Sequence, residues 1–109
     1  MGEDQKEFKE FKEFKEFYPF YLREHSHPMN RLLHVIGSMA ALVWLFFFIK
    51  TLIWWNLLAA LFTGYGLAWI GHFLIEKNRP ATFRYPLYSF MGDWVMFFEV
   101  ITFQRALRD

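Results

Sequence analysis

The sequence predicts an all-α integral membrane protein: a two-span antiparallel transmembrane hairpin with an N-terminal amphipathic helix and a C-terminal interfacial helix. Two long apolar segments, residues 32–49 and 52–75, follow each other with almost no break. The 109-residue chain is also 55% hydrophobic and 23% aromatic, more apolar surface than so small a soluble domain can bury. In addition, the break is nearly equidistant from His34 and His72, which gives the hairpin one polar end.

Composition narrows the classes of function. The length suits a single membrane domain, residues 1–109. The net charge of +1 disfavours nucleic acid as a partner. Because the chain has no cysteine, it has no disulfide, no thiolate nucleophile and no cysteine metal ligand. Histidine, aspartate and glutamate remain as the strong candidate ligands.

Residues 1–17 form a low-complexity segment in which Lys-Glu-Phe is repeated four times. The phenylalanines recur every three residues, so on a helix of 3.6 residues per turn the aromatic stripe winds slowly around the axis. We expect an amphipathic helix resting on the membrane surface. A frayed, solvated tail is the alternative.

The two apolar segments are long enough to cross a bilayer. Residues 32–49 carry no formal charge and, at about 1.5 Å per residue, cover roughly 27 Å. Residues 52–75 are longer and suit a tilted span. Pro28 favours a helix start at that position. The connector, residues 50 and 51, is so short that the two helices are expected to run antiparallel.

Basic residues predict the orientation. The hairpin tip carries only Lys50, whereas the other ends carry Arg23, Arg31, Lys77, Arg79 and Arg84. The positive-inside rule then places both chain ends and the histidines on the cytoplasmic side. The membrane would be the inner membrane in a bacterium or the endoplasmic reticulum in a eukaryote.

The C-terminal part is expected to be a loop followed by one helix. Residues 76–92 are punctuated by Pro80, Pro86 and Gly92, and Asp93 is a suitable N-cap for a helix over residues 94–107. That helix is too short to cross comfortably, so we predict that it lies in the interface. A third span that recruits residues before Gly92 stays open.

Helical spacing predicts a polar cluster at the cytoplasmic end. Asn30 and His34 share one helix face, and His72 and Glu76 share another, beside small residues that let two helices approach closely. An antiparallel hairpin brings these faces together, and His25, just before the first helix, can fold over the same pocket. His27 is expected to face solvent.

Several kinds of site fit such a cluster. Two imidazoles with a carboxylate are typical of non-haem Fe(II) oxygenases, and three imidazoles with water describe catalytic zinc. A haem with His34 and His72 as axial ligands is a third option. A non-catalytic membrane assembly protein whose histidines only face headgroups is the alternative without a metal. The residues alone leave these options open.

Two histidine-containing segments and the tail carry a family resemblance. The first is FYPFYLREH at residues 17–25, followed by Pro28, Asn30, Arg31 and HVIG at 34–37; the second is GHFLIEKNRPA at 71–81; the tail contributes YPL at 85–87, Gly92, Asp93 and MFF at 96–98. In order and spacing they resemble the family of small membrane proteins that includes the 2-hydroxy fatty acid dioxygenase, in its short prokaryotic-type form. The resemblance covers about residues 17–107.

The resemblance implies an Fe(2+)-dependent dioxygenase that uses O₂ to convert a 2-hydroxy fatty acid into the fatty acid one carbon shorter. It also implies that His25, His34 and His72 are the catalytic residues and the iron ligands. On geometry we add Glu76 as a candidate fourth ligand or base.

The expected partners are the membrane lipid bilayer, a fatty acyl substrate and O₂. An apolar groove below the histidines would hold the acyl chain, and Asn30, Arg31 or Arg79 would hold the substrate carboxylate, arginine through a bidentate clamp. The chain length of the substrate and the oligomeric state, including a homo-oligomer, are left open by the sequence.

Overall fold

The computed structural model describes residues 11–107. Every regular element in this part of the chain is a helix, which confirms the all-α class. Their order is α2 (Phe14–Glu24), α3 (Pro28–Thr51), α4 (Trp55–Ile70), the π-helix η1 (Gly71–Glu76), the 3₁₀-helix η2 (Ala81–Phe83) and α5 (Pro86–Ile101). Residues 1–10 lie outside the described part, so the amphipathic helix expected there stays a prediction. For the rest of the Lys-Glu-Phe repeat the expectation is wrong, because residues 11–13 are not helical and Phe17 of α2 is buried in the protein core.

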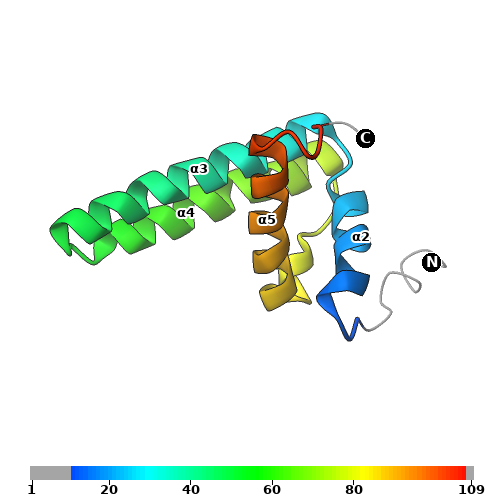
Figure 1. The fold of residues 1–109 in the computed structure, drawn as a ribbon, viewed down its shortest axis with the longest axis horizontal. Coiled ribbons are helices and arrows are strands. Elements are labelled where there is room, and N and C mark those ends of the chain that lie inside the picture. Colours follow the sequence, from blue (N-terminus) through cyan, green and yellow to red (C-terminus); the bar gives the residue numbers. More distant parts are fainter. Residues whose placement is uncertain (1–10, 108–109) are drawn as a thin grey trace.

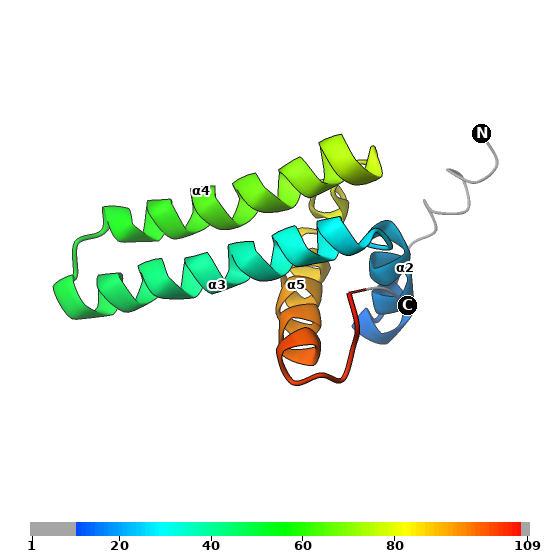
Figure 2. The ribbon, with the colours of Figure 1, turned by 90° about the horizontal axis from the view of Figure 1, so that it is seen from above.

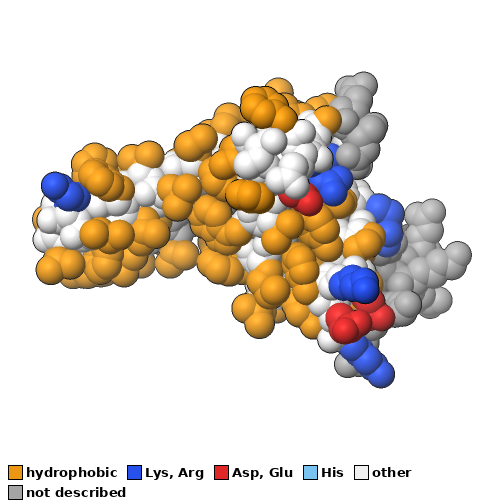
Figure 3. Space-filling view, viewed as in Figure 1, with side chains coloured by type: hydrophobic (Ala, Val, Ile, Leu, Met, Phe, Trp, Pro, Cys, Tyr) orange, Lys and Arg blue, Asp and Glu red, His pale blue; other side chains and the backbone are white. Residues whose placement is uncertain are grey.

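Helices α3 and α4 lie side by side and project away from α2 and α5 (Figures 1 and 2). They approach closely at Gly37, where an added Cβ would lie 3.1 Å from the carbonyl oxygen of Gly64. The residues Pro28–Thr51 and Trp55–Glu76 are long and apolar enough to cross a membrane. On the face shown in Figure 3, hydrophobic side chains cover the projecting pair, and most of the charged side chains gather at the end next to α2.

The connector between the two long helices differs from the prediction. Helix α3 continues through Thr51, so the break expected at residues 50 and 51 is wrong, and the connection is residues 52–54. Leu52 has a left-handed backbone (φ 56°), and its N–H donates to the carbonyl of Phe48. A left-handed residue closes a helix in this way, and a lysine in the last turn suits the helix dipole.

The last helix also begins earlier than expected. Helix α5 runs from Pro86 to Ile101, so the last helix is confirmed over residues 94–101, but the predicted bounds of that helix (94–107) and of the loop before it (76–92) are wrong. Pro86 supplies the start signal, because its fixed φ and missing N–H suit the first helical turn. Asp93 therefore lies inside a helix, not at its N-cap.

The core lies between α2 and α5. Phe17 and Tyr21 of α2 are almost fully buried and pack with Met96 of α5. Pro19 lies inside α2 without ending it. The two helices are also joined by hydrogen bonds from the Tyr18 hydroxyl to Glu99 and from the Tyr21 hydroxyl to Asp93. This contact fixes the C-terminal end of α2 beside the start of α3.

Candidate metal centre

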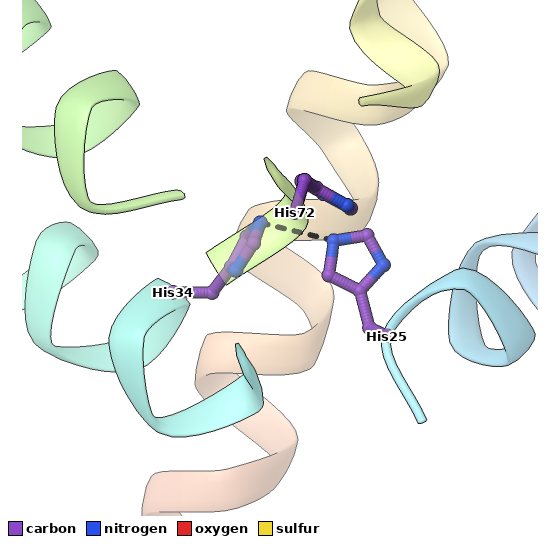
Figure 4. A group of neighbouring side chains, drawn as sticks. All are labelled: His25, His34 and His72. Atoms are coloured by element: carbon purple, nitrogen blue, oxygen red, sulfur yellow. Dashed lines mark hydrogen bonds between the residues drawn. The ribbon is translucent and has the colours of Figure 1, made fainter. Parts of the chain in front are cut away.

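Three histidines from three different elements converge at the end of the helix pair (Figure 4). His25 is the C-cap residue of α2, His34 lies two turns into α3, and His72 is the second residue of η1. All three are buried, and one ligand atom of each lies within 4.8 Å of the others. The structure therefore brings together the three histidines that the sequence analysis selected as ligands, and this group could hold a metal ion.

His72 occupies an irregular turn. In a π-helix the backbone hydrogen bonds span five residues, and such turns are rare and frequent at functional sites. The turn ends at Lys77, whose backbone is left-handed (φ 59°) and whose N–H donates to the His72 carbonyl. The Asn78 N–H donates to the same carbonyl over 2.9 Å. Residues after the helix thus fix the backbone of His72.

The Nδ1 atom of each ring lies against an oxygen that only accepts. His25 Nδ1 is 2.6 Å from the Tyr21 carbonyl, and His34 Nδ1 is 2.9 Å from the Asn30 carbonyl. His72 Nδ1 is 2.7 Å from Asn78 Oδ1. The Asn78 amide is oriented because its nitrogen donates to the Glu24 carbonyl. Each Nδ1 must therefore carry the proton, and each Nε2 is left with a lone pair.

The remaining nitrogens suit a cation. The Nε2 atoms of His25 and His34 are 2.9 Å apart, and with both protons on Nδ1 there is none between them. Burial, reinforced by the neighbouring imidazoles of His34 and His72, lowers the pKa of His25 well below its usual range, so the ring stays neutral. Neutral imidazoles that donate through one nitrogen and present the other are the usual form of metal-ligating histidine. The donor set therefore fits a metal ion.

The ring geometry does not suit a haem between His34 and His72. Their ring centroids are only 4.9 Å apart, their planes are nearly perpendicular, and His25 lies against both rings. A macrocycle held by two axial imidazoles needs to pass between them. The structure leaves no room for it.

A family model described as 2-hydroxy-palmitic acid dioxygenase Mpo1-like matches residues 11–105. The chain belongs to this family. No curated protein and no solved structure matches it. The Mpo1-like match includes all three clustered histidines and every element from α2 to α5.

Of the other residues predicted for the site, Glu76 does not join the histidines. Its carboxylate accepts hydrogen bonds from the backbone N–H of His27 and, over 3.5 Å, from the Ser26 hydroxyl. Glu76 thus binds the turn before α3, where a negative charge suits a helix N-terminus. Its role as a ligand or base stays a prediction. His27 is exposed, as expected.

The residues expected to hold a carboxylate occupy three different environments. The Arg31 guanidinium is fully buried and donates to the carbonyls of His25, Leu22 and Ala106. The side-chain amide of Asn30 is buried beside Gly71, where it has no hydrogen-bond partner in the described part of the chain. Arg79 is exposed. Their role in substrate binding stays a prediction.

Two cavities of this Mpo1-like chain meet beside His34. The larger, of about 350 Å³, lies between α3, α4 and α5 and is lined mainly by apolar side chains. The smaller, of about 10 Å³, has room for about one water molecule and is lined by all three histidines. No lysine or arginine is among the described residues that line either cavity. The residues common to both linings are His34, Tyr65, Ala68 and Asp93.

Three residues around the histidines were missed as site residues by sequence reasoning. Asn78 orients His72, as described above. The Tyr21 ring stacks on His25, with ring centroids 3.9 Å apart, and its hydroxyl donates to Asp93. Burial raises the pKa of Asp93 to about 7. The available signal was that Asp93 is the only charged residue in the apolar stretch 86–98.

Proposed function

We propose that this chain is an iron-dependent membrane dioxygenase that converts a 2-hydroxy fatty acid into the fatty acid one carbon shorter. The observation that carries the proposal is the convergence of three buried imidazole Nε2 atoms in a chain of the 2-hydroxy-palmitic acid dioxygenase Mpo1-like family. Imidazole ligands suit zinc as well as iron. Iron is favoured because a reaction with O₂ needs a redox-active metal, and zinc has no redox chemistry.

The overall reaction balances with O₂ as the only oxidant. The bond between the carboxyl carbon and the hydroxyl-bearing carbon breaks. The hydroxyl-bearing carbon becomes the new carboxyl group, and the old carboxyl carbon leaves as CO₂. RCH(OH)COOH and O₂ then give RCOOH, CO₂ and H₂O, and the electrons lost by the two carbons reduce both oxygen atoms to the level of water.

The residues of the chain have separate tasks in this proposal. His25, His34 and His72 would hold the iron, which when bound supplies O₂ activation. The Tyr21 and Asn30 carbonyls and the Asn78 amide keep each ring in the tautomer with a free Nε2. The burial of the three rings keeps bulk water away from the reacting atoms.

We also propose that α3 and the α4–η1 segment cross the membrane as a hairpin. Their length and apolar composition support this, and the distribution of lysine and arginine favours a cytoplasmic position for the histidines. A site at the lipid–water boundary suits a substrate with a polar head and an apolar tail. The tail would lie in the 350 Å³ cavity.

The test is turnover by the full-length protein, purified in detergent and loaded with Fe(II) without oxygen. We expect 2-hydroxypalmitate and O₂ to give pentadecanoate by mass spectrometry. His25→Ala, His34→Ala and His72→Ala should each reduce both bound iron and product to background. His27→Ala is the matched control, because this fourth histidine is exposed and lies outside the cluster. It should keep both.

A non-catalytic assembly protein would behave differently. Its histidines would bind no stoichiometric iron, and His72→Ala would act like His27→Ala. Stoichiometric iron without any pentadecanoate would contradict the proposed substrate but leave the metal site in place.

A further inference from the structure

Asp93 is a carboxylate at the junction of the two cavities. One of its oxygens, Oδ1, accepts a hydrogen bond from the Tyr21 hydroxyl. Its other oxygen, Oδ2, receives no hydrogen bond from the described residues. The side chain keeps some accessible surface, and because it lines both cavities, that surface faces the cavities. A partly buried carboxylate with an unoccupied oxygen can accept a hydrogen bond from a ligand.

Asp93 differs in charge from the other residues that line the two cavities. It is the only acidic residue in the described lining of either cavity. The neighbours shared by the two cavities are one imidazole, one phenol and one methyl group, from His34, Tyr65 and Ala68. A ligand head at this point therefore meets one carboxylate, that of Asp93, beside the imidazole of His34.

The larger cavity has an apolar end and a polar end, so a ligand with an apolar tail and a polar head would lie in one direction. On α3 its lining runs from His34 to Leu45, about 16 Å along a helix axis. That is about half of the roughly 30 Å hydrocarbon thickness of a bilayer, and so about the length of one lipid acyl chain. The apolar end suits a chain, and the end at His34 and Asp93 suits its head.

We propose that Asp93 is a specificity-determining residue, whose Oδ2 accepts a hydrogen bond from the 2-hydroxyl of a fatty acid with its tail in the larger cavity. This inference rests on the proposed function, because it deepens the choice of substrate. Tyr21 holds Oδ1 and so fixes the direction of Oδ2. An unhydroxylated fatty acid leaves the desolvated carboxylate without its partner, and a site built to bind a hydroxyl group rejects such an analogue.

The decisive experiment measures binding to metal-free protein. A bound metal would itself attract the hydroxyl group, so its removal excludes that contribution. The free imidazole nitrogens are the same in wild type and in the Asp93 variants, so the comparison between these proteins isolates the contribution of Asp93. Full-length protein in nanodiscs with excess chelator is titrated calorimetrically with 2-hydroxypalmitate and with palmitate at pH 8.5, where Asp93, whose pKa is about 7, is ionised. A hydrogen bond to a charged group corresponds to a preference of about 10- to 100-fold for the hydroxy acid. Asp93→Leu should lose the preference, and Asp93→Asn should keep only part of it.

Glu99 provides the matched control. It lies on the same helix as Asp93 and accepts a hydrogen bond from a tyrosine of α2, Tyr18, but it lines neither cavity. Glu99→Gln should therefore weaken a similar helix contact and leave the preference unchanged. If Asp93→Leu does not fold, Asp93→Asn alone tests the inference, since it must reduce the preference at least several-fold.

Three outcomes overturn the inference. One is a wild-type protein that binds both acids equally, and another is a preference that persists in both Asp93 variants. The third is a loss of stoichiometric iron in Asp93→Asn, which would make this residue part of the metal site. Turnover is scored separately. If the protein prefers the hydroxy acid through Asp93 but forms no pentadecanoate, the role of Asp93 is supported and the proposed oxidation is contradicted. If it forms pentadecanoate without this preference, the proposed oxidation is supported and the role of Asp93 is contradicted.

Discussion

The two ends of the helix pair follow opposite rules. Between residues 39 and 67 no side chain is buried, and large apolar residues such as Phe46, Trp54 and Phe62 are exposed. At the other end, the buried polar residues gather around the cluster: His25, Asn30, Arg31, His34, Ser38, His72 and Ser89. A soluble domain buries its apolar residues and exposes its polar ones. This chain reverses both, as expected if lipid surrounds one end and a reactive centre fills the other.

Substitutions at the two ends of the helix pair should therefore affect different properties of the protein. At the tip, side chains have few protein partners, so substitutions there should change insertion into the membrane more than stability or metal binding. At the histidine end, buried polar groups depend on one another for hydrogen bonds, so the loss of one leaves its partners unsatisfied.

Arg31→Met should have the largest effect on stability. The substitution removes the donors for three carbonyls, at His25, Leu22 and Ala106, in a fully buried place. Leaving a buried acceptor without its donor costs about 1–3 kcal/mol for each group. Arg79→Met is the control, because Arg79 is exposed, and its effect should stay within about 0.5 kcal/mol. Denaturant unfolding in detergent, followed by near-UV circular dichroism, measures both. Equal losses would show that Arg31 is not a structural anchor of His25.

Asp93 should make stability depend on pH. Its pKa is raised from 3.8 to about 7, so the folded protein holds this proton more tightly than the unfolded chain does. The stabilising contribution is therefore complete below about pH 4 and is lost as the pH rises through 7. Asp93→Asn stays neutral and lacks this loss, so its stability relative to the wild type should rise by up to about 4 kcal/mol between pH 4 and 7.

The Asp93 experiment compares metal-free wild type and variant in the same buffers. His25 makes stability change with pH in the opposite direction. Its pKa is lowered in the folded protein, so the unfolded chain binds the proton more tightly, and stability rises with pH until His25 is neutral in both states. The two proteins share His25, so its contribution cancels in the difference. A difference that does not change with pH would contradict a raised pKa at Asp93.

Asn78→Ala should weaken metal binding without abolishing it. The variant loses the acceptor that orients His72 and the donor to the Glu24 carbonyl. Loss of a group that orients a metal-ligating histidine typically reduces affinity about 10- to 100-fold. Asn56→Ala is the control at the tip, where the Asn56 amide donates to Thr51 and Ile53. Competition with a calibrated chelator gives both affinities. A similar change in both variants would remove the distinction between the two ends.

The sequence predicts the helices better than the site. The apolar length of the spans and the position of Pro28 are local features, and helical spacing is enough to bring His34 towards His72. The contacts of Glu76 and Asn78 depend on where the chain turns after η1, which no local pattern specifies. Glu76 binds the His27 N–H because the start of α3 leaves N–H groups without partners.

Asp93 illustrates why the rest could not be predicted. An aspartate directly after Gly92 is a reasonable N-cap signal, but Pro86 already starts the helix. The carboxylate instead meets Tyr21, seventy-two residues earlier in the chain, and the cavities. Local propensity gives way here to a tertiary contact, as often happens at functional sites.

Ala60→Phe should shift the preferred chain length of the substrate, the smallest effect expected here. Ala60 lines the far part of the larger cavity, together with Leu45 and Leu57. A phenyl ring there fills space that only the end of a long acyl chain would reach. Turnover of 2-hydroxypalmitate should fall about tenfold relative to 2-hydroxylaurate, because a shorter tail loses few contacts and a longer one overpacks the cavity.

Leu58→Phe adds a ring on the same helix outside that lining, at an exposed position, and should leave the ratio of the two rates unchanged. The Ala60 result therefore tests whether the apolar end of the molecule takes part in catalysis at all. If both variants leave the ratio unchanged, the tail does not enter the space between α3 and α4, and this end serves only the membrane. If only Ala60→Phe changes it, the two ends of the helix pair act on the two ends of one substrate.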